Sequence, residues 1–533
     1  MNRQYIGARY VPLVYENTVD PSSAEWQENV NYEPMIIVTF NLGSYMSKKY
    51  VPASVGNPAE NPDYWVQMGQ YNGQIAHLQS EIDALDDKVD NITVTPELFG
   101  AKGDGIADDT DAVQSALNSG CRVYLKNTYL VSVSEEAPFH HGLVVPNGCI
   151  IEGSGTLKLN PNDYSNYDIL YIPVNSDNVR IKDITIYGDS LQHTGNTGEW
   201  GFGINVDGGN NVVIENVTID NCWGDGILIG NLDDTTLHNG NNYVTVKNCK
   251  VTNNGRNNIS VSHGKNIVID GCDISGAYRT APRAGIDVEP DSTENVNNCV
   301  IVNNFIHDNS GSQVSVNDTH TNSLYRVTIN NNIIKGVYGV GGFVYGGGTG
   351  KGTIVSDNII ETTGTVLDGS QNFACVFKNN LVKYNGSSIP VKMSGANAVI
   401  NDNVFEVSTT ESICISFIGC IYGEISNNTF SGVPGPGFWI DTDADCEHIK
   451  ISKNKVSFNT GACSGYIRIN STKHITVIGN EVSDVNPPVY FIQSLAASGT
   501  EFVAFNNAYF TSSFEVSNTV KKAANILNGT YTE

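Results

Sequence analysis

One short repeat sets the strongest limit on how this chain can fold. An asparagine with an apolar residue two positions later returns eight times, at intervals of about 22–28 residues. The eight copies begin at Asn304, Asn332, Asn358, Asn380, Asn403, Asn428, Asn454 and Asn480. Repeats of this length are typical of solenoids, because one unit is too small to bury its apolar face and must stack on its neighbours.

A second repeated arm is a short run in which apolar and polar residues alternate, which predicts a strand. Five copies align: Gly203-Ile-Asn-Val-Asp207, Gly226-Ile-Leu-Ile-Gly230, Asn258-Ile-Ser-Val-Ser262, Gly285-Ile-Asp-Val-Glu289 and Gln313-Val-Ser-Val-Asn317. Stacking these strands lines up Ile204, Ile227 and Ile259 as one inward ladder. We therefore predict an all-β fold, a single-stranded parallel β-helix. Val217, Cys249 and Cys272 occupy the asparagine column in earlier rungs, which explains these cysteines without redox chemistry.

The composition agrees with this fold and excludes several partners. Charged residues are 16% of the chain and hydrophobic residues 40%, and the net charge is −26. Such a charge argues against nucleic acid and against an anionic membrane surface. The eleven cysteines contain no C-x-x-C pair, which argues against a disulfide framework or a zinc ribbon. We expect no metal and no cofactor, and the sequence has no membrane-spanning run.

The chain is expected to divide into five parts. Residues 1–70, rich in Tyr, Pro and Trp, predict a small all-β anchoring or carbohydrate-binding-like module, whose aromatic rings form its own core or bind sugar. Residues 71–94 predict a coiled-coil helix with the seam Ile75, Leu78, Ile82, Leu85, Val89 and Ile92. The rest is an opening segment with a capping helix (95–118), the β-helix (119–500) and a C-terminal cap (501–533).

The opening segment carries the most specific motif. Phe99-Gly-Ala-Lys-Gly-Asp-Gly-Ile-Ala-Asp-Asp-Thr-Asp-Ala-Val113 closely resembles the motif that begins the right-handed β-helices of the pectate-lyase-like superfamily. The resemblance implies that its last residues start a helix that caps the open end of the core. Asp109 or Thr110 suits the N-cap. Calcium binding by Asp104, Asp108 and Asp109 is a weaker alternative, because the spacing differs from an EF-hand loop.

An anchoring module, a coiled coil and a β-helix in this order resemble a phage tailspike or tail appendage. The resemblance implies a homotrimer in the virion tail that binds a bacterial surface polysaccharide, with the N-terminal module attached to other tail proteins. The seam itself predicts a parallel oligomer without fixing the number of subunits. The start of the sequence lacks the apolar region of a secretory signal, so we expect synthesis in the host cytoplasm and action at the bacterial surface.

Acidic residues single out one region of the β-helix as a candidate site. Asp287 and Glu289 are two positions apart on one strand and both point outward, with Cα atoms about 6.6 Å apart. Two carboxyl groups at such a distance can flank a glycosidic bond, one acting as general acid. The alternative is a solvated pair, or one neutralised by arginine. Asp225, two rungs earlier, is a further candidate for base or nucleophile.

Other polar and aromatic residues gather on the same rungs. We expect substrate binding by His263, Arg256, Arg283, Trp200, Trp223 and Asp207. The arginines can hold a carboxylate of the enzyme or of an acidic sugar. The tryptophans fall in one column and can stack on sugar rings or shield a turn. The order Asp207, Trp223-Gly-Asp-Gly226, Ser262-His-Gly264 and Asp287 is distantly similar to polygalacturonase-type hydrolases, but the second adjacent Asp and the later Arg-x-Lys are absent. The stretch 255–290 also looks like mannuronan epimerase relatives, although it lacks their Asp-Pro-His-Glu signature.

Three functions fit these residues. The first is depolymerisation of a polysaccharide by hydrolysis, with Asp287, Glu289 and Asp225 as catalytic groups. The second is a lyase or epimerase acting on uronates, for which Arg256 and His263 supply a cation and a base. The third is a receptor-binding tail protein that holds a glycan without cutting it. Hydrolysis is preferred because acids, arginines, a histidine and tryptophans concentrate in one region.

Overall fold

A computed structural model describes residues 25–70 apart from 42, most of 93–494, and short strand segments between 502 and 532. The gaps within 93–494 are residues 121, 137–138, 231–239, 291–293, 318–322, 342–351, 370–374, 410–412, 434–436, 459–464, 471–472 and 484–489. The chain forms two compact units, Met1–Ile92 and Thr93–Glu533, and each is described by itself.

The smaller unit is built around an antiparallel three-stranded sheet. It contains β1 (Ile37–Phe40), β2 (Gly43–Ser47) and β3 (Trp65–Gln70) in the order β1-β2-β3. Tyr32, Tyr45 and Trp65 are buried in its core, and the rings of Tyr32 and Trp65 meet edge to face at 5.2 Å. These three aromatic residues therefore stabilise the module. Residues 71–92 of the predicted coiled coil lie outside the described part, and residues 93–94 belong to a strand, β4 (Thr93–Val94).

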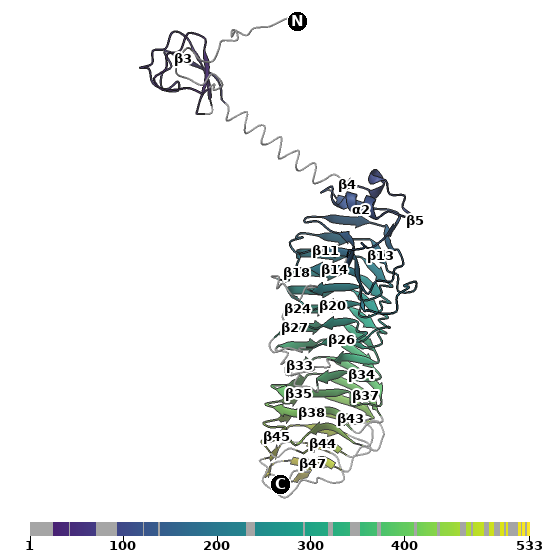
Figure 1. Cartoon of the computed structure of the whole chain (residues 1–533). Coiled ribbons are helices and arrows are strands. Elements are labelled where there is room, and N and C mark those ends of the chain that lie inside the picture. Colours follow the sequence, from purple (N-terminus) through teal and green to yellow (C-terminus); the bar gives the residue numbers. More distant parts are fainter. Residues whose placement is uncertain are drawn as a thin grey trace. The chain divides into compact units, whose positions relative to one another are not determined.

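The larger unit is a parallel β-helix, as the repeat predicts (Figure 1). Each rung visits three sheets in turn, which we number in chain order. The first sheet consists of fourteen strands that lie one above another. They are β8 (His140–Val144), β11 (Asn166–Ile172), β14 (Trp200–Asp207), β17 (Ile227–Gly230), β20 (Ile259–Val261), β23 (Ile286–Val288), β26 (Ser312–Val316), β29 (Tyr338–Gly341), β32 (Leu367–Gly369), β35 (Val391–Ala396), β38 (Ile413–Ile421), β41 (Phe438–Thr442), β44 (Gly465–Ile469) and β47 (Tyr490–Ser494).

The second and third sheets complete the rungs. In the region of the site the second sheet contains β15 (Asn210–Glu215), β18 (Asn241–Lys247), β21 (Gly264–Asp270), β24 (Val296–Val302) and β27 (Leu324–Asn330). The third sheet contains β22 (Asp273–Ser275), β25 (Phe305–His307), β28 (Ile333–Gly336), β31 (Ile359–Thr362), β34 (Leu381–Gly386), β37 (Val404–Thr409) and β40 (Thr429–Val433). Parallel pairing continues past residue 500 through β48 (Phe502–Phe505), β50 (Lys521–Ala523) and β51 (Asn525–Leu527), so the ladders run into the predicted C-terminal cap.

The predicted register is confirmed in the core. Ile204 pairs with Ile227, Ile227 with Ile259, and Ile259 with Ile286, and all four are fully buried. The predicted asparagine column is a hydrogen-bonded ladder. Asn380 Oδ1 accepts from both the backbone N and Nδ2 of Asn358 at 3.0 Å, and the same pattern links every neighbouring pair from Asn304 to Asn480. Each cysteine that the structure describes is buried and free of disulfide bonds.

The opening segment contains the predicted capping helix, α2 (Thr110–Leu117), which buries Val113, Ala116 and Leu117 on the end of the core. Asp109 is its N-cap residue by position, but no backbone N–H of the helix donates a hydrogen bond to that side chain. The carboxylate of Asp109 instead accepts from the backbone N of Lys102 and Gly103, at 2.7 and 3.0 Å. Asp109 is therefore the N-cap residue, one of the two expected, and its carboxylate stabilises the preceding turn.

Candidate functional site

The acidic region lies on the outer face of the first sheet, across β14, β17, β20, β23 and β26. Strand register places one outward column here, Asn205, Leu228, Ser260, Asp287 and Ser315. These side chains point away from the core, yet each is at most 8% exposed. The outer face is therefore covered at these rungs, and its polar groups lie in a shielded network instead of on an open surface.

Asp287 is the most perturbed acid of this network. Its side chain is 2% exposed, and Oδ2 accepts from Nδ2 of Asn257 at 3.2 Å. The other carboxyl oxygen, Oδ1, is buried without a hydrogen-bond partner. Burial raises the pKa of Asp287 from 3.8 to about 7, the charge of Glu289 acts in the same direction, and Arg256 opposes them. A carboxyl group in this environment carries a proton for much of the time near neutral pH.

Asp225 is held very differently. Its Oδ2 accepts from Nη1 of Arg256 at 3.0 Å and from Oγ of Ser260 at 2.6 Å, while Oδ1 accepts from the backbone N of Asn257 at 2.9 Å. Burial lowers the pKa of Arg256, but the charges of Asp225, Asp287 and Glu199 outweigh burial and raise it. Asp225 and Arg256 therefore form a buried ion pair that fixes a positive charge near Asp287.

Glu289 and His263 flank this core of the site. Glu289 follows β23, is partly exposed, and its backbone N donates to the carbonyl of Val261 at 3.0 Å. His263 is 4% exposed, and its Nδ1 accepts from the backbone N of Asn295 at 3.1 Å. This hydrogen bond assigns the ring proton of neutral His263 to Nε2.

The two predicted tryptophans have unequal access to a ligand. Trp200 is 45% exposed at the start of β14, so its ring is accessible. Trp223 is 7% exposed, and its ring is stacked on His193 at 4.0 Å while the guanidinium carbon of Arg279 lies 3.4 Å from its ring centroid. Since both neighbours cover the ring of Trp223, the structure favours the alternative of a turn shield for this residue.

The remaining predicted residues are on neighbouring rungs. Asp207 is 4% exposed, and its Oδ2 accepts from the hydroxyl of Tyr171 at 2.9 Å. Arg283 is exposed in the turn before β23, with a positive φ of 60°. Asp225, Arg256 and Asp287 are thus brought together, whereas Arg283 and Trp200 lie at the surface.

The sequence reasoning missed a histidine–carboxylate pair on the same sheet. Nδ1 of His141 is 3.0 Å from Oδ2 of Asp168, and the imidazole stacks on Tyr171 with 3.9 Å between ring centroids. Burial raises the pKa of Asp168, against the opposing effect of His141. The strand alignment can be extended one rung back, to residues 166–172. That extension places Asp168 on the rung next to Gly203-Ile-Asn-Val-Asp207 and would have indicated this acid.

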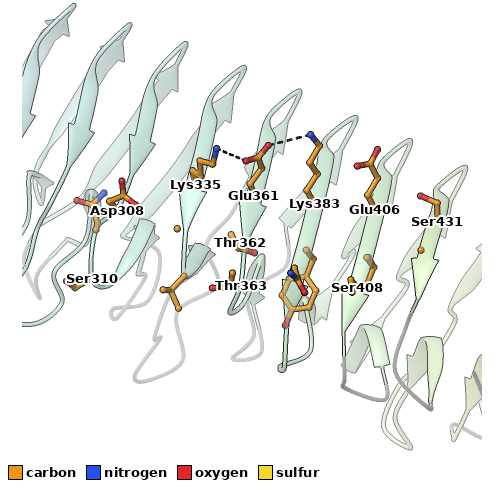
Figure 2. Close-up of a pocket in the computed structure, with 17 residues that line it drawn as sticks. Asp308, Ser310, Lys335, Glu361, Thr362, Thr363, Lys383, Glu406, Ser408 and Ser431 are labelled. Atoms are coloured by element: carbon orange, nitrogen blue, oxygen red, sulfur yellow. Dashed lines mark ion pairs between the residues drawn. The ribbon is translucent and has the colours of Figure 1, made fainter. Parts of the chain in front are cut away.

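A groove on the third sheet was also missed. It has a volume of about 1140 Å³ and follows the turns that lead from the third sheet to the first, over the rungs of β25 to β40. Figure 2 shows Lys335, Glu361, Lys383 and Glu406 projecting in one row along it. These charged residues occupy outward positions of the third sheet, which the apolar and asparagine repeats do not include.

Two classes of feature do not occur in the described residues. No three or more His, Cys, Asp and Glu side chains of the described part are grouped to hold a metal ion. Among the same residues no helix combines the length and apolar character needed to cross a membrane.

Comparison with known proteins supports the fold. Residues 230–360 match the family described as right handed beta helix region, and residues 345–533 match the family described as periplasmic copper-binding protein (NosD). The uncharacterized protein YclG of Bacillus subtilis (strain 168) is 26% identical over 57% of this chain and 57% of its own length. The pre-neck appendage protein of Bacillus phage phi29 is 25% identical over 44% of this chain and 28% of its own.

A solved structure gives the same result. The pre-mature bacteriophage phi29 gene product 12 aligns with a TM-score of 0.53 and 15% identity, covering 82% of this chain and 68% of that one. The chain spans 28–57% of the length of the curated relatives named above. With its three parallel ladders and these matches, the chain is a right-handed parallel β-helix protein.

Proposed function

We propose that the protein is a phage tail appendage that binds a bacterial surface polysaccharide and hydrolyses its glycosidic bonds. Similarity to the phi29 pre-neck appendage protein supports the place in a phage tail. The observation that carries the catalytic proposal is the buried carboxyl of Asp287, whose pKa of about 7 lies well above the ordinary value. Glycosidases need such a group to protonate the leaving oxygen at neutral pH.

The two acids of β23 have complementary roles in this mechanism. Protonated Asp287 donates its proton to the glycosidic oxygen as the bond from that oxygen to the anomeric carbon breaks. Glu289, partly exposed and two residues further on, acts as nucleophile or activates the water that adds to the anomeric carbon. Asp225 is a positioning residue in this scheme, because it keeps Arg256 near both acids. Because Asp287 is 2% exposed, the proposal requires the groups that cover it to move aside when a substrate binds.

The rest of the chain has supporting roles in the proposal. Residues 1–70 attach the protein to other tail components, and the coiled coil predicted for residues 71–92 holds three copies in parallel. Trp200 offers an exposed ring for a sugar, and Arg283 is exposed in the turn before β23. His263 and Asp207 contribute to the proposal as buried groups of the same rungs. The proposed location is the virion tail, with action at the bacterial surface.

A second candidate is glycan binding without cleavage. It is favoured by one specific observation, the 2% exposure of Asp287. The carboxyl groups would then stabilise the fold of these rungs, and recognition would take place elsewhere on the surface.

Release of reducing ends from a panel of bacterial surface polysaccharides tests the proposal. The wild type is compared with Asp287→Asn, Glu289→Gln and the control Asp368→Asn, which lies in the same outward column on β32. Hydrolysis predicts new reducing ends that both site variants abolish and the control retains. Absorbance of unsaturated uronates would show a lyase instead, and binding without release would show the second candidate.

A further inference from the structure

A histidine paired with a buried carboxylate lies on the first sheet, away from Asp287. Nδ1 of His141 in β8 is 3.0 Å from Oδ2 of Asp168 in β11, and the two residues are register partners. The side chain of Asp168 is fully buried, whereas that of His141 is 30% exposed. Strand pairing places β11 four rungs from β23, which is about 19 Å at about 4.8 Å per rung. The pair is therefore separate from the acids assigned to glycosidic cleavage.

The surroundings of Asp168 hold its carboxylate toward the imidazole. Nδ2 of Asn205 donates to Oδ2 of Asp168 at 3.1 Å, and the backbone N of Gly142 donates to the same carboxylate. An ionised carboxylate only accepts hydrogen bonds, so neutral His141 carries its ring proton on Nδ1. The hydrogen bonds of this ring within the described residues are made by Nδ1. Nε2 is then the nitrogen that offers a lone pair to an incoming molecule.

Aromatic rings fix the orientation of the imidazole. The ring of His141 stacks on Tyr171 with 3.9 Å between centroids and an angle of 13°, and the ring of Phe139 lies 5.4 Å away. The hydroxyl of Tyr171 donates to Asp207 at 2.9 Å, so Tyr171 is itself held in place. Val144 pairs with Tyr171 on the neighbouring strand and is 39% exposed. The imidazole is thus preorganised beside an open apolar surface that a small acyl group can contact.

We propose that His141 is the general base of a second activity, the hydrolysis of an acyl ester on the bound glycan, with Asp168 as its positioning residue. Nε2 takes a proton from a water molecule while the water oxygen bonds to the acyl carbon. The bond from that carbon to the sugar oxygen then breaks. The sugar oxygen receives the proton from the imidazolium, which leaves a sugar hydroxyl and a carboxylic acid. The carboxylate of Asp168 stabilises the imidazolium between the two steps.

An ester is the class of bond that suits this pair. Ester hydrolysis needs a base that activates water, whereas cleavage of a glycosidic bond also needs an acid that protonates the leaving oxygen. Asp168 does not suit the role of that acid, because it is fully buried and faces the imidazole. The glycan is the one of the proposed function, but the ester chemistry does not depend on glycosidic cleavage.

Hydrolysis of p-nitrophenyl acetate by the full chain tests the base. The wild type is compared with His141→Gln and with the matched control His140→Gln. His140 is the neighbouring half-buried histidine, but its Nδ1 hydrogen-bonds the carbonyl of Ser134 at 2.8 Å instead of a carboxylate. We expect the wild type to release p-nitrophenolate faster than buffer does. His141→Gln should lose at least about tenfold in rate, and the control should stay within about twofold of the wild type.

The role of Asp168 needs a readout that a merely structural carboxylate would not change. Asp168→Asn should lower kcat at least about tenfold and leave KM within about twofold, with an unchanged circular dichroism spectrum. Adding Asp168→Asn to His141→Gln should cause no further loss of rate, because the two residues act as one unit. A further loss in the double variant would overturn the positioning role.

Two products separate this inference from the proposed glycosidase. O-acetylated members of the polysaccharide panel are assayed for acetate and for reducing ends. Reducing ends without acetate that depends on His141 would overturn the ester hydrolysis alone, whereas acetate without reducing ends would support it and refute the glycosidase. Where neither product forms, the chromogenic ester decides. A wild-type rate equal to that of buffer, or equal losses in His140→Gln and His141→Gln, would overturn the inference.

Discussion

Replacement of Asp287 by asparagine should change the pH dependence of stability, with a sign that follows from the burial of this carboxyl. The pKa of this carboxyl is 3.8 in the ordinary case and about 7 in the fold, chiefly because it is buried. Each pKa unit corresponds to about 1.4 kcal/mol, so the whole shift corresponds to about 4 kcal/mol. The folded state binds the proton more tightly than the unfolded chain does. Protonated Asp287 therefore contributes stability below pH 4, and this contribution is lost between about pH 4 and pH 7.

Urea unfolding followed by tryptophan fluorescence at pH 5 and pH 8 measures this effect. From pH 5 to pH 8 the wild type should lose about 3 kcal/mol through Asp287, and Asp287→Asn should not. The variant should therefore gain about 3 kcal/mol on the wild type across this interval. Asp368→Asn should show no such gain, and Glu289→Gln should show part of it, because removal of the neighbouring charge lowers the pKa of Asp287. An equal difference between Asp287→Asn and wild type at both pH values would refute a raised pKa and the role of Asp287 as acid.

Three further predictions concern the surrounding structure. Arg256→Met should destabilise the fold by about 3–5 kcal/mol in urea titrations, since it leaves Asp225 charged and buried, and Asp225→Asn in the same chain should restore part of the loss. Asn380→Ala should cost about 2–4 kcal/mol by the same measurement, because it leaves the backbone N of Asn358 and other ladder groups without partners, whereas the exposed Asn385→Ala should cost under about 0.5 kcal/mol. Ile259→Ala should lower stability by about 2–5 kcal/mol through the cavity it leaves in the inward ladder.

The fold was predictable because the same alternation of apolar and polar residues recurs in many successive rungs. A single run such as Gly285-Ile-Asp-Val-Glu289 is compatible with several kinds of strand. Five aligned copies fix which residues point inward, since only one alignment stacks Ile286 on Ile259 and Ile227. The asparagine column independently shows how neighbouring rungs align. Its side chains form a hydrogen-bonded ladder, which explains why asparagine recurs at this position. Both signals depend on neighbouring rungs, which a sequence repeat reveals directly.

The state of the site was less predictable, because it depends on what covers the sheet. The alternation along β23 correctly places Asp287 outward, and outward normally means solvated. In the structure Asp287 is 2% exposed, and burial accounts for the largest part of its raised pKa. One neighbour of Asp287, Asn257, comes from the connection before β20, and such connections differ in length from rung to rung. A periodic sequence therefore predicts which way a side chain points but not how deeply it is buried.

Residues that look equivalent in the sequence also differ in how deeply they are buried. Trp200 and Trp223 occupy one column, yet one ring is exposed and the other lies against His193 and Arg279. His193 comes from the segment before β14 and Arg279 from the segment before β23. Two connections that do not repeat therefore bury the ring of Trp223. The groove is lined by a regular column of charge on the third sheet and by the strand ends and turns that lead to the first sheet. In this β-helix the repeated strands form a regular scaffold. We expect ligands to bind where irregular connections between the strands change the surface of that scaffold.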